Sequence, residues 1–72
     1  MEWKLAIKYC IYDDKFERYD SAEEEIWFED HPNWSSAFQS LKREAKLTEE
    51  ELKSDDRKYL FLTLSVENVT EK

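Results

Sequence analysis

Apolar and polar side chains alternate at the start of the chain. The apolar set occupies odd-numbered positions, namely Trp3, Leu5, Ile7, Tyr9 and Ile11. A period of two residues is typical of a β-strand that buries one of its faces. We therefore predict a strand over residues 2–12 whose odd-numbered side chains lie in the core.

The end of the chain alternates in the same way. One set of positions is rich in leucine (Leu60, Leu62, Leu64 and Val66), and the other set holds Tyr59, Phe61, Thr63 and Ser65. This pattern predicts a strand over residues 57–67 whose leucine-rich face lies in the core. Because the two terminal strands carry the most apolar faces, we expect them to be neighbours in one sheet.

The middle of the chain has helical spacing. Four apolar residues recur at intervals of four, three and four, which places them on one face of a helix: Trp34, Phe38, Leu41 and Ala45. Thr48 and Glu51 match a capping box, which predicts a short second helix or a continuing turn over residues 48–54. Asp55 and Asp56 then predict the turn into the last strand. Because the chain has no glycine, we expect a positive φ to fall on aspartate or asparagine.

The segment after the first strand is ambiguous. Residues 15–20 follow an Asp-Asp turn and could return as a hairpin strand. In residues 21–30, Ser21 and Glu24 form a capping box, which favours a helix. The Ile-Trp-Phe run in the same segment has high strand propensity, and its glutamates would repel one another at helical spacing. Helix is slightly favoured, and both interpretations stay open.

Length and composition limit the fold. A chain of 72 residues forms one domain, residues 1–72, with a thin core. Its eleven aromatic residues give this core large side chains, although 40% of the residues are charged. We predict an α+β domain with a small antiparallel sheet of two or three strands. Helices pack on one face of this sheet, in the order β-β-(α)-α-β.

The net charge of −7 arises in one stretch of the chain. Residues 13–30 hold two bases and nine acids: Asp13, Asp14, Glu17, Asp20, Glu23, Glu24, Glu25, Glu29 and Asp30. The rest of the chain is neutral. Such a charge distribution favours a basic protein partner and disfavours bare nucleic acid or an anionic membrane. The alternative is a solvated face that only improves solubility.

Several classes of site are excluded by what the chain lacks. Without glycine it has no recognisable phosphate-binding loop, dinucleotide fingerprint or nucleophile elbow. The single cysteine, Cys10, cannot form an internal disulfide, which favours a reducing cytoplasm. The single histidine, His31, lacks the neighbours that metal sites have at characteristic spacings. We predict a soluble, cytoplasmic protein that is not an enzyme, has no cofactor or metal, and contacts no membrane.

Aromatic side chains also fall on the polar faces of the two terminal strands. If the odd-numbered and leucine-rich faces are buried, an outer patch forms from Ala6, Cys10, Tyr12, Tyr59 and Phe61. Tyr19 and Trp27 could extend this patch. Interfaces favour aromatic anchors inside a charged rim, so we predict Tyr12, Trp27 and Tyr59 as partner-binding residues. The alternative is a second minor core that the acidic segment covers.

In its clustered acids, aromatic content and lack of enzyme motifs, the chain resembles the small acidic inhibitors that bacteriophages encode. These include DNA-mimic and anti-CRISPR proteins. The resemblance lies in composition and charge layout, and it implies stoichiometric inhibition of a nucleic-acid-binding protein in the host cytoplasm. The nine acids would then stand in for a row of phosphates. The alternative function is a small adaptor or subunit that self-associates through a strand edge or the aromatic face.

Overall fold

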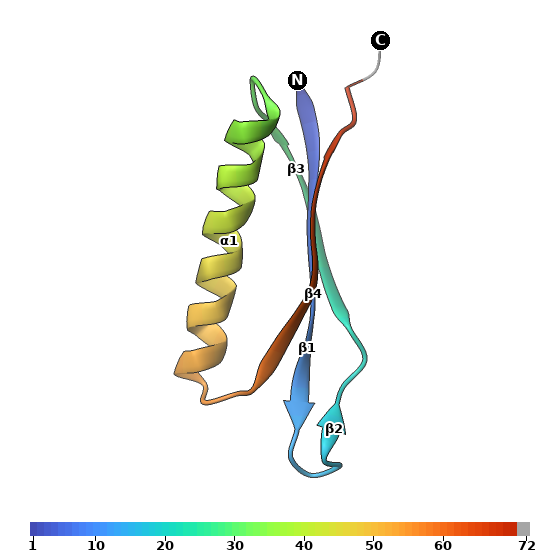
Figure 1. The fold of residues 1–72 in the computed structure, drawn as a ribbon, viewed down its shortest axis with the longest axis vertical. Coiled ribbons are helices and arrows are strands. Elements are labelled where there is room, and N and C mark those ends of the chain that lie inside the picture. The colour runs from blue at the N-terminus through green and yellow to red at the C-terminus, as the bar shows by residue number, and fades with distance from the viewer. Residues whose placement is uncertain (71–72) are drawn as a thin grey trace.

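The computed structural model describes residues 1–70, which form a four-stranded antiparallel sheet and one helix (Figure 1). The elements are β1 (Glu2–Asp13), β2 (Arg18–Tyr19), β3 (Glu23–Asp30), α1 (Trp34–Ser54) and β4 (Tyr59–Asn68). The α+β class is therefore confirmed. The sheet has four strands where two or three were predicted, and in the described residues one long helix replaces the expected pair.

Strand β1 is the centre of the sheet. It pairs antiparallel with β3 over residues 2–9 and with β4 over residues 3–11, so these two strands lie on opposite sides of it. The predicted contact between the first and last strands is thus confirmed. The short strand β2 pairs with the last two residues of β1. Helix α1 covers one face of the sheet and leaves the other face open (Figure 1).

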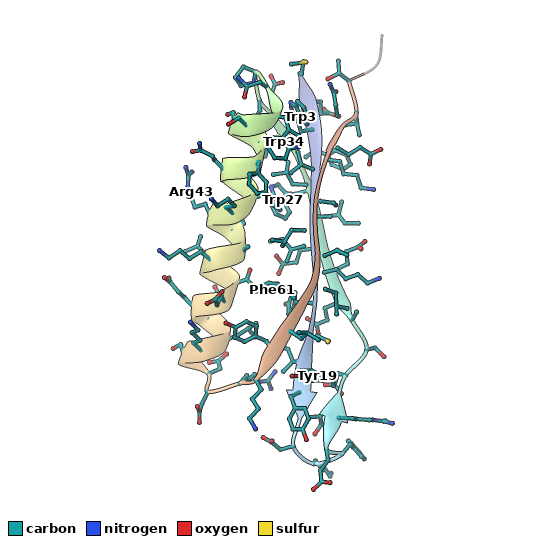
Figure 2. All side chains as sticks on the ribbon, in the orientation of Figure 1. Trp3, Tyr19, Trp27, Trp34, Arg43 and Phe61 are labelled. Atoms are coloured by element: carbon teal, nitrogen blue, oxygen red, sulfur yellow. The ribbon has the colours of Figure 1, made fainter. Side chains whose placement is uncertain are left out.

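The core lies between β1 and α1. The odd-numbered side chains of β1 are buried as predicted, with Ile11 only partly covered. They pack against helix residues that also share one face, namely Ala37, Leu41, Ala45 and Leu52. Trp3 and Trp27 both lie between the helix and the sheet (Figure 2). Apolar burial at this single interface is the main source of stability that the fold has.

The prediction that β4 buries its leucine-rich face is wrong for Leu60, Leu62 and Leu64, and it is confirmed for Val66, which lies opposite Leu5 and packs against the core. Leu60, Leu62 and Leu64 are 44–47% exposed, whereas Tyr59 and Phe61 pack against the core. The register explains this outcome, because Tyr59 lies opposite Ile11 and Phe61 opposite Tyr9. Leu62 is an extra, unpaired residue at a bulge, which changes the alternation along the strand. A shift of one residue moves side chains to the other face of a sheet.

Residues 23–30 form a strand, so the slightly favoured helix is wrong. All eight residues of β3 pair with β1, and Trp27 lies opposite Leu5, where it packs against the core. Tertiary pairing and the β-propensity of the Ile-Trp-Phe run outweigh the local capping box. As a strand, the segment also avoids placing its glutamates at helical spacing.

Helix α1 runs for 21 residues without a break. Asn33 caps its start, since the Asn33 side chain accepts a hydrogen bond from the Ser36 N–H. Thr48 is buried on the face that carries Leu41, Ala45 and Leu52, so a new helix does not begin there. The predicted second helix over residues 48–54 is therefore wrong, because the apolar face of the first helix continues through this segment.

The turns meet the need for positive φ without glycine. Asp56 has φ of 55° in the turn before β4, which confirms the expectation that an aspartate takes this conformation. Glu17 has φ of 52° at the tip of the β1–β2 hairpin, which the sequence analysis did not anticipate.

Candidate functional site: an acidic sheet edge

The acidic stretch follows one long edge of the molecule. Four of its carboxylates belong to the β1–β2 hairpin, and we call them the hairpin tip: Asp13, Asp14, Glu17 and Asp20. The other five lie on β3, and we call them the acidic edge: Glu23, Glu24, Glu25, Glu29 and Asp30. Strand β3 pairs with β1 on one side only, so the acidic edge is a border of the sheet.

The carboxylates of the acidic edge project to both sides of the sheet. Glu23, Glu25 and Glu29 lie opposite Tyr9, Ile7 and Trp3, and therefore on the side of the helix. Glu24 and Asp30 lie on the open side, where Glu24 is opposite Lys8. The nine acids thus follow a rim and do not form a single row on one face.

Glu29 is held within the molecule. Its Oε1 atom accepts hydrogen bonds from Ser40 Oγ at 2.5 Å and from His31 Nε2 at 2.8 Å. These two bonds lower the pKa of Glu29. His31 Nδ1 lies 2.9 Å from Ser36 Oγ, so the imidazole joins the end of β3 to the first turn of α1.

The hydrogen-bonded series Ser36, His31 and Glu29 has the order of a nucleophile, a base and an orienting acid. A hollow of about 420 Å³ adjoins it. Both imidazole nitrogens are engaged, and Ser40 bonds the same carboxylate oxygen as His31. We assign the series to joining β3 and α1, a role that the sequence analysis missed because the contacts cross between elements.

Asp30 is also engaged, because its Oδ1 lies 2.9 Å from the N-terminal ammonium of Met1. This hydrogen bond lowers the pKa of Asp30. At the other end of the edge, Glu23 Oε2 accepts a bond of 3.2 Å from the Tyr9 hydroxyl. Burial, and then this bond, raise the pKa of Tyr9.

The first three residues of the acidic edge have no cationic partner within 4.0 Å among residues 1–70. Among residues 1–70, the ion pairs within 4.0 Å that involve the acidic edge are those of Glu29 and Asp30. Glu23, Glu24 and Glu25 are exposed and consecutive on the border strand. Three of the nine predicted contacts thus form one exposed group at the start of β3.

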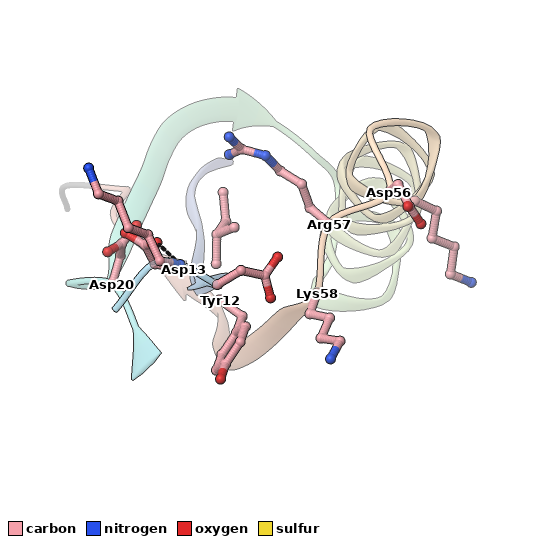
Figure 3. A pocket seen from close by; sticks show the side chains of 10 residues that line it. Tyr12, Asp13, Asp20, Asp56, Arg57 and Lys58 are labelled. Atoms are coloured by element: carbon pink, nitrogen blue, oxygen red, sulfur yellow. Dashed lines mark hydrogen bonds between the residues drawn. The ribbon is translucent and has the colours of Figure 1, made fainter. Parts of the chain in front are cut away.

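The hairpin tip faces bases of its own chain. A hollow of about 650 Å³ separates it from the turn between α1 and β4 (Figure 3). Four acids and four bases line this hollow: Asp13, Asp14, Asp20, Asp56, Lys15, Lys53, Arg57 and Lys58. The negative potential of the tip is thus offset locally, in contrast to that of Glu23–Glu25.

The predicted aromatic patch does not form on the open face. Tyr12 and Tyr19 do meet there, with ring centroids 5.3 Å apart. Trp27, Tyr59 and Phe61 instead lie on the helix side and pack against the core, because β3 is a strand and β4, before its bulge at Leu62, has the opposite phase from that predicted. The open face carries two apolar side chains that the analysis missed, Ile26 at 47% and Phe28 at 57% exposure. The available signal was their period of two, which places them on the opposite side of the strand from Trp27.

Other classes of site find little support in the described residues. Within residues 1–70, no group of three or more His, Cys, Asp or Glu side chains is placed to hold a metal ion. In the same range, no helix has both the length and the apolar character needed to cross a bilayer. Comparisons with protein-family models, curated proteins and solved structures found no match.

Proposed function

We propose that this protein is a non-enzymatic inhibitor that binds a basic, nucleic-acid-binding protein in the cytoplasm through its acidic edge. The observation that carries the proposal is the placement of Glu23, Glu24 and Glu25. They are consecutive and exposed on an outer strand, and no basic group among residues 1–70 lies within 4.0 Å of their carboxylates. A compact negative group of this kind attracts a lysine- and arginine-rich surface.

The attraction is Coulombic and does not copy the geometry of a nucleic acid. Carboxylates on one side of a strand are about 6.8 Å apart, which approximates the spacing of phosphates. However, Glu24 projects to the open side while Glu23 and Glu25 project to the helix side. The edge therefore competes for a cationic groove by charge, and its shape need not follow the phosphate backbone.

Apolar contact would supply the short-range part of binding. Ile26 and Phe28 continue along β3 from the acidic group, and both are on the open side of the sheet. Interfaces commonly combine an exposed aromatic anchor with a charged rim. Phe28 and Ile26 thus replace Trp27 and Tyr59 as the proposed anchors.

A matched pair of charge reversals tests the proposal. The variant Glu24→Lys/Glu25→Lys reverses two of the three consecutive charges on the acidic edge. The variant Glu44→Lys/Glu50→Lys makes the same charge change on the exposed side of α1. Immobilised wild type and both variants are incubated with a bacterial lysate at low and high salt. Circular dichroism first checks that both variants fold.

We expect the wild type and the α1 variant to retain a basic partner at low salt and to lose it at high salt. The acidic-edge variant should not retain it. Added protein should also displace a fluorescent DNA duplex from the purified partner. Equal capture by both variants, or capture that is insensitive to salt, would exclude the acidic edge as the binding surface.

A further inference from the structure

The second border of the sheet, β4, presents free backbone groups. Even-numbered residues of β1 face β4, since the Tyr12 N–H donates to the Lys58 carbonyl and the Val69 N–H donates to the Glu2 carbonyl. Leu64 lies opposite Ile7, an odd-numbered residue. The N–H and C=O of Leu64 therefore point away from β1, as do those of Val66 opposite Leu5.

Apart from its bulge at Leu62, this border carries few of the features that keep strand edges apart. Strand β4 carries one charged residue, Glu67, in ten positions and has no proline or lysine. Strand β3, by contrast, has five acids in eight positions. The three exposed leucines of β4 add apolar surface beside the free backbone groups. Natural proteins protect long edges of this kind by charge, bulges or a cover.

We propose that β4 pairs antiparallel with β4 of a second copy of the chain, across a two-fold axis perpendicular to the sheet. The bulge at Leu62 leaves residues 63–68 as the regular segment available for pairing. The two sheets then form one continuous sheet, and both helices lie on the same face of it. Leu64, on the helix side, and the flanks of the two helices meet over the joint.

Among possible contacts between two copies, the charge distribution favours the one through β4. Each chain carries a net charge of −7, which opposes most modes of self-association. Pairing through β4 places the two acidic edges at opposite borders of the joined sheet, about 24 Å apart for five strand spacings. The acidic edges cannot continue the pairing, so assembly stops at a closed dimer and does not extend into a fibre.

The broadest side of the molecule sets the upper limit on the area of this contact. The molecule measures 49 × 21 × 13 Å, and Figure 1 looks along the shortest dimension, directly at β4 and the flank of α1. The outline of this broadest side exceeds the roughly 800 Å² that each partner buries in a standard interface. Its opposite side ends in the acidic edge, so the two broad sides differ sharply in charge.

Sedimentation equilibrium of the purified protein tests the dimer. We expect the wild type to have twice the monomer mass of 8.8 kDa, and added salt to maintain or tighten the association by screening repulsion. Leu62→Lys/Leu64→Lys should raise the dimer Kd about tenfold or more, because edge lysines oppose strand pairing. The matched control, Ile26→Lys/Phe28→Lys, adds the same charge on β3 and should remain dimeric.

A backbone test is independent of these side chains. Leu64→Pro removes an outward N–H that makes no bond to β1, so it should produce a folded monomer. In the wild type, hydrogen exchange at the Leu64 and Val66 amides should slow as concentration rises. A monomeric wild type, a dimer that survives both β4 variants, or exchange that does not depend on concentration would overturn the proposal. Glu24→Lys/Glu25→Lys should leave the dimer intact, which separates this test from that of the acidic edge.

Discussion

Ser40 donates a hydrogen bond of 2.5 Å to Glu29, and this contact ties the end of β3 to the second turn of α1. Composition alone counts Glu29 as one more surface charge. In the structure, Glu29 is half-buried and accepts from two donors. Part of the acidic stretch therefore serves the fold, while Glu24 and Glu25 form no ion pair within residues 1–70.

The first prediction concerns acid stability. Because hydrogen bonds lower the folded-state pKa of Glu29, its carboxylate stabilises the fold above the unfolded-state pKa of about 4.3. That contribution is lost as the pH falls through the lower folded-state pKa. We expect Glu29→Gln to be less stable than the wild type at pH 7 and to lose less stability on acidification. Urea midpoints at several pH values measure this, with Glu44→Gln as the control. Parallel pH curves for the wild type and Glu29→Gln would contradict it.

The second prediction tests which face of β4 is buried. Phe61 makes edge-to-face contacts with Tyr9 and Tyr59, at centroid distances of 6.0 and 5.5 Å. Phe61→Ala should therefore destabilise the monomer by about 2 kcal/mol or more, and Leu60→Ala by less than about 1 kcal/mol. Chemical denaturation in the Leu64→Pro background excludes any effect of a dimer. A larger loss of stability for Leu60→Ala than for Phe61→Ala would show that the leucine-rich face is the buried one.

The fold was predictable where one periodicity dominated. In β1 the alternation is strict, and the pairing on both sides keeps its phase. In β4 both faces are apolar, so the choice between them depends on a bulge at Leu62 that has no signature in the sequence. Residues 23–30 form a strand because they pair with the second side of β1. This pairing joins segments that are distant in the sequence, so local propensity does not reveal it.

The sequence predicted which residues of the site carry charge, but it did not predict to which side of the sheet each carboxylate projects. Composition located the nine acids, but only the register separates Glu24 from Glu23 and Glu25. The partners of Glu29 and Asp30 come from the helix, the adjoining loop and the chain start, so their engagement could not be read from spacing. Trp27 was taken for a surface anchor because aromatic residues suit both cores and interfaces.

The third prediction uses the strained residue at the hairpin tip. Glu17 has φ of 52°, a conformation that a residue with a Cβ atom adopts at a cost of about 1 kcal/mol. Glu17→Gly should therefore keep or raise stability by up to about 1 kcal/mol, although glycine is more flexible when unfolded. Asp14→Gly, at a position without positive φ, should lower it. Thermal unfolding of both variants distinguishes them, and an equal loss in each would refute the assignment of strain.

The last prediction concerns the repulsion that the free carboxylates exert on one another. Glu23 and Glu25 share one side of the border strand, and Glu24 lies between them in sequence. Because these groups lack cationic partners, removing one charge should relieve repulsion in the folded state. We expect Glu25→Gln to gain a few tenths of a kcal/mol, about 0.3, at low ionic strength and nothing in about 0.5 M salt. Glu44→Gln, which changes the same charge on α1, should gain less. If the two variants gain equal stability at low salt, the negative potential at the acidic edge is no stronger than that elsewhere on the surface. The edge would then not attract a basic partner in preference to the rest of the surface.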